Sequence, residues 1–440
     1  MRILLIFIYS NLFSIVLKAQ NADSIINELK TINQSINNKD CNAGAAAISN
    51  RAMNVFLADK IGYLSGNYDD LSMYTNFVTL NSAEGKIAIN HNVENPSGTD
   101  EPIKTLFSIG ASATINNQFA ASFLDRSYET ELGFTLNYKW LEKVKTRFKD
   151  CTLSTQKKNM DALRAGILHQ LETEIIKKDI EFKSSLNKII ANEIPGQNID
   201  TAKAMISTAF YADLKDEYEE KFATQQAETL TNTNNFKLIS TGWTSFNIYI
   251  PLVTPRYAIA PSFTGMFQNK YSYPLDITFS HTRLWESSSA GRFFLTLSGD
   301  VLLNNSKLSY GLDRTNYSDY KINGGTDTSR LAELKNNKAF IGNYETFVTP
   351  SLKGRFVYYP ANSHFGIAFS VEQNFGKYNP LNGKITVPIV LINSKRLPAV
   401  NFNFDVLLLD LTNNYPALKK TGGKTMIGLE VGIPFSRLMF

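Results

Sequence analysis

Alternation of apolar and polar side chains limits the folds open to this chain more than any other feature. From Lys424 to Phe440 nearly every second residue is apolar, and those between are mostly small or polar. The apolar set is Ile427, Leu429, Val431, Ile433 and Phe435. Because successive side chains of a β-strand point to opposite faces, the pattern predicts a strand with one apolar face.

Segments of this kind recur from residue 86 to the end of the chain, and about twelve of them, with 257–267 included, give the even number typical of bacterial barrels. Residues 61–85 alternate in part but are left out, because a further strand disturbs this parity. A large soluble β-sandwich alternates as well. We therefore expect a mainly β fold, an antiparallel transmembrane barrel over residues 86–440, with a soluble secreted β-protein as the alternative.

The last strand and its final aromatic, Phe440, resemble the closing strand of Gram-negative outer-membrane β-barrels. The resemblance is to this class of protein and implies contact with outer-membrane lipid and with the barrel-insertion machinery, which reads that strand. The N-terminus points to the same compartment. Met1, Arg2 and an apolar run over 3–16 predict a signal peptide, residues 1–19, cleaved near Ala19. No other run approaches the ~20 apolar residues of a membrane-spanning helix.

Connection lengths orient the predicted barrel, since one rim of such barrels carries short turns and the other long loops. Counting back from Phe440 at the periplasmic rim places the short connections 253–255, 359–363 and 394–397 there. The same count places the long connections 304–343 and 141–235 outside. Residues 20–85 are then a periplasmic N-terminal segment of helical character.

Residues 141–235 differ from the rest because their apolar residues recur at intervals of three and four. Two such stretches lie on either side of Pro195-Gly196, which predicts a helical hairpin in an extracellular loop. Cys41 would lie inside and Cys151 outside, so the count predicts no disulfide between them. The outward hairpin is a candidate binding surface for a protein partner.

Catalytic chemistry is not indicated by the sequence. His91, His169, His281 and His364 lack the spacing of a metal motif, and none has a Ser two residues later, as outer-membrane phospholipases do. Cleavage of the predicted signal peptide removes Arg2 and Lys18. The mature chain then has 43 basic and 40 acidic residues, a net charge of +3, and contains no long basic run. We therefore predict no enzymatic activity, cofactor, metal or nucleic-acid partner.

Charged residues within the predicted strands are candidates for the barrel lumen, because Arg or Lys on the lipid face costs ~2–4 kcal/mol near the midplane. Those on the polar register are Glu131, Asp276, Arg292, Asp300, Glu372 and Glu430. Such charges either set the solute preference of an open channel or fill a closed barrel with ion pairs.

Two functions fit these expectations. The barrel is either a surface anchor or transport-associated protein whose hairpin binds a partner, or a passive porin-like channel for small solutes. An insert as long as residues 141–235 exceeds what conductance needs, so we favour the first.

Overall fold

The structure is a computed structural model that divides into two compact units. It describes residues 21–37, 48–62, 75–81, 86–93, 100, 102–114, 132–148, 154–193, 199–233, 236–254, 256–322, 332–393, 398–413, 415 and 425–437. The helical unit comprises Met1–Phe56, Thr99–Glu101 and Arg147–Asn235, and the barrel unit comprises the remainder.

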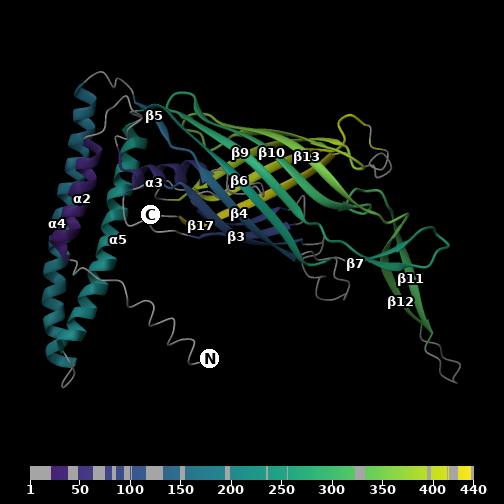
Figure 1. Cartoon of the computed structure of the whole chain (residues 1–440), viewed down its shortest axis with the longest axis horizontal. Helices are drawn as coiled ribbons and strands as arrows, with labels where there is room; N and C mark the ends of the chain where they lie inside the picture. The colour runs from purple at the N-terminus through teal and green to yellow at the C-terminus, as the bar shows by residue number, and fades with distance from the viewer. Residues whose placement is uncertain are drawn as a thin grey trace. The chain divides into compact units, whose positions relative to one another are not determined.

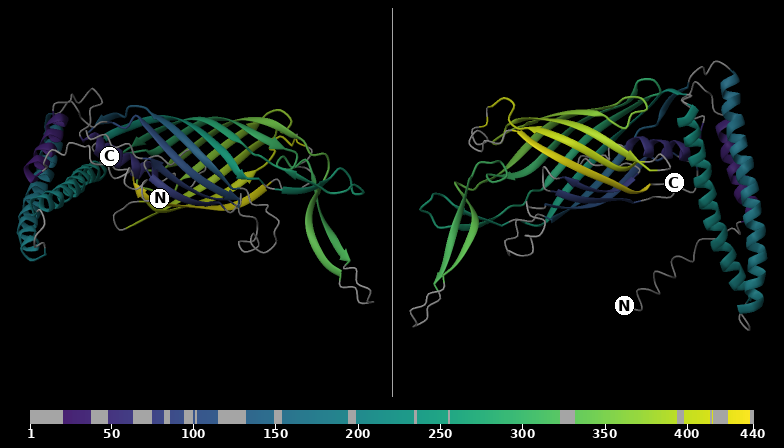
Figure 2. Two further views of the ribbon diagram at one scale, coloured as in Figure 1. Left: turned by 60° about the horizontal axis from the view of Figure 1, so that its bottom comes forward. Right: turned by 180° about the vertical axis from the view of Figure 1, so that it is seen from behind.

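Twelve antiparallel strands of the barrel unit form a closed circuit (Figures 1 and 2). They are β1 (Thr75–Asn81), β2 (Lys86–Val93), β3 (Thr105–Thr114), β4 (Leu132–Leu141), β6 (Phe236–Val253), β9 (Asp276–Ser287), β10 (Gly291–Asn305), β13 (Thr346–Tyr359), β14 (Ile367–Asn374), β15 (Leu381–Ile392), β16 (Pro398–Leu408) and β17 (Thr425–Arg437). Pairing of β4 with β6 and of β1 with β17 completes the circuit, while the short β5 (Lys145–Phe148) lies beside β6 outside it. The predicted fold, a barrel with an inserted helical segment, is confirmed.

The barrel wall alternates between exposed apolar and inward polar side chains. On β14, Phe369 and Val371 are exposed, whereas Ser370 and Glu372 between them face inward. Exposed large apolar side chains occur in this way on every strand of the circuit. Strand periodicity therefore predicted the correct face along most of the barrel.

Strand registers define the two rims of the barrel. Thr75 pairs with Arg437 and Thr105 with Trp140, so β1 begins where β4 and β17 end. We call this the proximal rim and the opposite one the distal rim. The turns 288–290 and 360–366 lie at the proximal rim, and the connections 254–275, 306–345 and 375–380 lie at the distal rim.

Two strand predictions were wrong, although the total was right. β1 belongs to the barrel, which therefore begins at Thr75 rather than at residue 86. Residues 257–267 do not span it, because β7 (Arg256–Ala260) pairs in a separate four-stranded sheet with β8 (Gln268–Tyr271), β11 (Asp313–Ile322) and β12 (Ala332–Ile341). Tyr257 and Ile259 alternate because they pack on Leu312 in this second sheet.

Including β1 in the barrel and leaving out residues 257–267 moves every connection before residue 257 to the rim opposite the predicted one. β4 ends and β6 begins at the proximal rim, so the helical insert joins the barrel at the rim where β17 ends. The count from Phe440 had put the insert at the opposite rim, and that prediction was wrong. The connection between β6 and β9 likewise lies at the distal rim, not at the proximal rim predicted for 253–255.

Three helices pack together in the helical unit: α2 (Ala22–Asn37), α4 (Ser154–Glu193) and α5 (Ile199–Thr233). The α4–α5 hairpin was predicted, but its packing against the N-terminal helix was not. Their shared core is Ala22, Ile25, Ile26, Leu29, Leu168, Leu171, Ile175, Tyr211, Leu214, Tyr218 and Phe222. Because α2 packs on the hairpin, the N-terminal segment and the insert cannot lie on opposite sides of a membrane. Among the described helices, none is both long and apolar enough to cross a bilayer.

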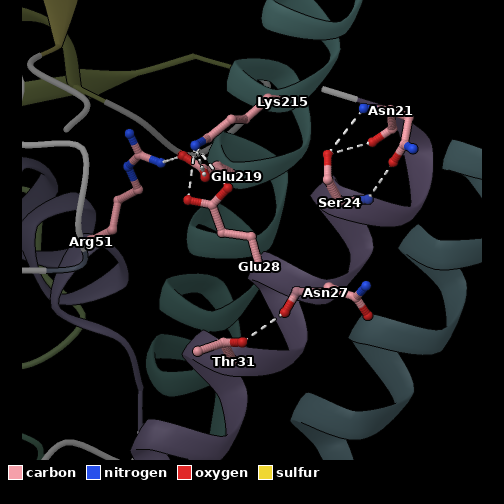
Figure 3. Close-up of polar contacts among 8 residues, drawn as sticks. All are labelled: Asn21, Ser24, Asn27, Glu28, Thr31, Arg51, Lys215 and Glu219. Carbon is pink, nitrogen blue, oxygen red and sulfur yellow. Dashed lines mark hydrogen bonds and ion pairs between the residues drawn. The ribbon is translucent and has the colours of Figure 1, made fainter. Parts of the chain in front are cut away.

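Local sequence explains where α2 begins. Asn21 Oδ1 accepts a hydrogen bond from the Ser24 backbone N–H at 2.8 Å, and Ser24 Oγ accepts one from the Asn21 backbone N–H at 3.0 Å (Figure 3). This reciprocal cap satisfies two backbone donors that a helix start otherwise leaves unpaired. The Ile25, Leu29 and Ile36 side chains that follow are all buried.

Ion pairs connect the helices around this core. Lys215 Nζ lies 2.7 Å from Glu28 Oε2 and 3.6 Å from Glu219 Oε1, linking α2 to α5 (Figure 3). Between α4 and α5, the Glu217 carboxylate forms ion pairs with Lys178 Nζ at 2.6 Å and with Lys221 Nζ at 2.9 Å. The Lys215–Glu28 pair and the two pairs to Glu217 are partly exposed, so each contributes little alone and weakens with salt, whereas Glu219 is buried.

We expect the melting temperature of the helical unit to depend on pH through Glu217. The hydrogen bond from Lys178 lowers the pKa of Glu217 below its ordinary value of 4.5. A carboxyl whose folded pKa is lowered stabilises the fold above its unfolded pKa, and this stabilisation is lost as pH falls through the folded pKa. The difference in melting temperature between wild type and Lys178→Met should therefore shrink as pH is lowered from 7 to 3. A constant difference would show that Glu217 is not held by Lys178.

Candidate functional site

The end of helix α3 (Asn50–Ile61) reaches two walls of the barrel. Lys60 Nζ lies 3.9 Å from Glu286 Oε1 on β9, and Asn401 Nδ2 on β16 donates a 2.7 Å hydrogen bond to the Gly62 carbonyl. Four strands of the circuit separate β9 from β16 on one side and six on the other. The two contacts are thus on nearly opposite walls, and the end of α3 crosses the proximal mouth.

Burial explains why this part of α3 stays in the mouth. Leu57, Ala58 and Ile61 are at most 1% exposed. The inward side chains of the wall at the proximal end are also large and fully buried, among them Trp243, Leu284, Phe294 and Tyr359. Apolar burial of this extent is the main stabilising term available to the segment.

A buried ionic group surrounds Lys60. Arg292 Nε lies 2.6 Å from Glu286 Oε2, and the Arg292 guanidinium lies 5.8 Å from the centre of the Tyr359 ring. Burial lowers the pKa of Lys60, while the nearby Glu286 carboxylate acts in the opposite direction. Glu286 therefore has two cationic partners, Arg292 on the neighbouring strand β10 and Lys60 on α3.

A second ionic group lies on β15, β16 and β17. Lys384 Nζ is 2.9 Å from Asp405 Oδ2 and 4.0 Å from Glu430 Oε2. Thr386 Oγ1 also donates to Asp405, at 2.6 Å. Both carboxylates are almost completely buried, so the ammonium and hydroxyl groups offset the cost of removing them from water.

Five of the six lumen candidates from the sequence lie on the inward register: Asp276, Arg292, Asp300, Glu372 and Glu430. Glu131 lies outside the described residues. The structure brings Arg292 to Glu286 and Glu430 to Lys384, while Asp300 accepts a hydrogen bond from Ser351.

Four of the residues in these ionic groups were not among the lumen candidates from the sequence, and Asp405 on β16 is one of them. Glu286 is at a strand end, where alternation weakens, and Lys384 was not recognised as lumenal although it precedes the outward Ile385. Lys60 carries no local signal, because its position in the barrel depends on wall residues far away in the sequence.

Lys86 is the one charged residue on the inward register of β1, β2 and β3 among the described residues, and the other inward positions carry apolar, amide, hydroxyl or small side chains. Asn76 Oδ1 accepts a 2.6 Å hydrogen bond from the Asn92 backbone, and Ser108 Oγ donates to Asn92 Oδ1, also at 2.6 Å. The other charged residues face this amide and hydroxyl surface from the remaining strands.

Exposure varies along the lumen. Thr282 and Leu284, near the α3 end, are fully buried. Six inward charged residues farther from the proximal rim keep intermediate exposure, three acidic and three basic: Asp276, Asp300, Glu372, Lys353, Arg355 and Lys384. Water therefore reaches the middle of the lumen, although the proximal end is filled.

The described residues contain no group of three or more His, Cys, Asp or Glu side chains arranged to hold a metal ion. His281 is on the outer face, with Nε2 3.9 Å from Glu142 Oε1. Cys41 and Cys151 lie outside the described residues. No protein-family model matches the chain, and no curated protein was found to be similar in sequence.

Proposed function

We propose that this chain is a non-enzymatic outer-membrane barrel, closed at its proximal rim, that anchors the helical unit for a protein partner. Support for a membrane location comes from the outer face, where Phe279, Leu297 and Leu352 are each more than half exposed. A water-soluble barrel turns such residues inward, and exposed apolar surface of this extent is typical of contact with lipid or protein.

Aromatic side chains near the proximal ends of the strands also fit a membrane interface. The Tyr138 and Trp140 rings on β4 lie 4.7 Å apart, edge to face. Phe293 on β10 stacks on Tyr358 of β13, also at 4.7 Å. Rings of this kind form the girdles of membrane barrels.

We further propose that the proximal rim faces the periplasm. The short turns 288–290 and 360–366 lie there, and periplasmic turns are short in these barrels. The helical unit, whose insert joins this rim, would then be periplasmic, and the sheet of β7, β8, β11 and β12 would be extracellular. The partner bound by the hairpin would accordingly be a periplasmic protein.

The observation that carries the closed state is the end of α3 in the proximal mouth, fixed to β9 and β16. A passive porin-like channel is the second candidate, and the water-accessible charged residues of the middle lumen favour it. Conductance distinguishes the two, because a filled mouth blocks ions whereas an open lumen passes them steadily.

We expect the purified full-length protein to give no steady current in planar bilayers. Insertion is checked independently by flotation with lipid vesicles. The matched comparison is a chain in which residues 141–235 are replaced by a short turn, which should remain silent because α3 is retained. A stable open-channel current from the full-length protein would reject the closed anchor and support the porin-like channel.

A further inference from the structure

We propose that the outer wall of the barrel binds a phospholipid whose headgroup carries both a phosphate and a primary ammonium, at a patch formed by Glu142, His281 and Arg283. The whole patch lies within the barrel unit, and its role as a lipid site rests on the proposed membrane location. It goes beyond that location because the wall then prefers one class of lipid.

Charged side chains on an outward register that is otherwise apolar are the feature that points to a ligand. On β9, His281 and Arg283 follow Ile277 and Phe279 on this register, and Glu142 directly follows β4. An arginine facing lipid is costly at the midplane, but the cost falls to little near the interfaces. Arg283 lies four residues before the last residue of β9, at the proximal rim, so its depth suits the headgroup region.

Strand pairing arranges the outward side chains of β4, β6 and β9 in successive rows, since these strands are neighbours in the wall (Figure 1). From the proximal rim towards the middle of the wall, the rows are Glu142, Gly242 and Arg283; Trp140, Thr244 and His281; Tyr138, Phe246 and Phe279; and Leu136, Ile248 and Ile277. The rows change from charged to mixed, then to aromatic and finally to aliphatic. A phospholipid has the same order of polarity from its headgroup to its acyl chains, with aromatic side chains preferring the level between them.

The wall holds the carboxylate of Glu142 in a defined position. Its backbone N–H donates to the Gly242 carbonyl at 2.8 Å, and its carbonyl accepts from Thr241 Oγ1 at 3.2 Å. A Cβ at Gly242 would meet the carboxyl carbon of Glu142 at 3.1 Å, so the glycine lets the side chain lie against β6. Thr244 Oγ1 lies 3.0 Å from His281 Nδ1, which leaves the other ring nitrogen facing Glu142.

The charged groups of the patch are loosely paired and remain open to the outside. Arg283 Nη1 lies 3.4 Å from Glu142 Oε2, and His281 Nε2 lies 3.9 Å from Glu142 Oε1. Charge-assisted hydrogen bonds between such groups are about 2.7–2.9 Å long. The three side chains also keep between 33% and 41% exposure. The guanidinium and the carboxylate therefore both retain hydrogen-bonding capacity for a ligand.

Opposite charges within one patch define the headgroup. The Arg283 guanidinium matches two oxygens of a phosphate, whereas the Glu142 carboxylate only accepts hydrogen bonds and so fits an ammonium that donates them. An anionic headgroup without an ammonium places a negative charge next to Glu142, and a trimethylammonium group has no N–H to donate. A phosphoethanolamine headgroup satisfies both side chains.

Retention of lipids by the full-length protein tests this site. The protein is purified in detergent, incubated with equimolar phosphatidylethanolamine, phosphatidylcholine and phosphatidylglycerol, and analysed by native mass spectrometry. We expect about tenfold more bound phosphatidylethanolamine than either competitor, because a hydrogen bond to a charged group accounts for a factor of this size.

Two variants assign the preference to the patch. Glu142→Gln should remove the preference for phosphatidylethanolamine over phosphatidylglycerol, because the carboxylate that selects the ammonium is lost. Arg283→Ala should lower the retention of all three lipids, because all three carry the phosphate. Arg314→Ala is the matched control and should retain lipids like wild type, since Arg314 is exposed on β11 in the separate sheet. Heat-dependent gel mobility verifies that each barrel is folded.

The possible results separate this site from the membrane barrel itself. Equal retention of the three lipids by folded wild type, or a preference for phosphatidylglycerol, would overturn the site and leave the membrane barrel intact. An unchanged preference in folded Glu142→Gln would also overturn it. Failure of the protein to float with vesicles of phosphatidylethanolamine and phosphatidylglycerol would instead reject the membrane location proposed above, and the site with it.

Discussion

Phe279→Lys should lower the free energy of unfolding of the reconstituted barrel by about 2–4 kcal/mol, the cost of a lysine facing lipid near the midplane. Phe279 is 56% exposed on the outward face of β9. On a water-soluble barrel the same change of an exposed residue falls within about 0.5 kcal/mol of neutral. Denaturant unfolding in lipid vesicles, followed by tryptophan fluorescence, measures the difference.

Thr278→Lys is the matched control for this prediction. Thr278 precedes Phe279, faces the lumen and lies directly across from Asp300 on β10. The new ammonium stays in a water-accessible, partly acidic environment, so we expect a much smaller loss of stability than for Phe279→Lys. Equal effects at the two positions would remove the distinction between a lipid face and a lumen face.

Leu171→Ala should destabilise the helical unit by about 2–5 kcal/mol, since it removes a fully buried leucine and leaves a cavity. Leu171 is 0% exposed in the core shared by α2, α4 and α5. Loss of helical circular-dichroism signal on heating the full-length protein should occur at a distinctly lower temperature than in wild type.

Leu163→Ala on the same helix is its control. Leu163 is 43% exposed and lies outside the shared core, so its removal should change the helical transition little. A wild-type transition in Leu171→Ala would contradict the packing of α2 on the hairpin. It would also remove the structural reason for placing both on one side of the membrane.

Alternation predicts strands well where one face meets the outside and the other meets a polar lumen. Ile385 and Val387 on β15, with Lys384 and Thr386 facing inward, show this pattern. It fails at β1, because Phe77 faces the filled proximal end while Val78 and Leu80 face outward. Apolar residues then occupy both faces, and the strand loses its signature.

Periodicity also cannot tell which sheet a strand joins. β7 alternates like a barrel strand, but its apolar residues are buried in the distal sheet. Because β7 was counted as a barrel strand in place of β1, the predicted number of strands was correct but the insert was assigned to the wrong rim. The α3 end was beyond prediction for a different reason, since Lys60–Glu286 and Gly62–Asn401 are long-range contacts that no local pattern encodes.

Spin labels placed singly at each position from 348 to 356 on β13, in lipid vesicles, test the membrane barrel most directly. The structure predicts high accessibility to oxygen, which concentrates in lipid, at Val348, Leu352 and Phe356, which are all exposed outward. Labels at Ser351 and Lys353 should be shielded from oxygen and reached only by the water-soluble quencher. Accessibility with a period of two residues is the predicted result. Outward positions that the water-soluble quencher reaches as readily as the inward ones would contradict a membrane-embedded barrel.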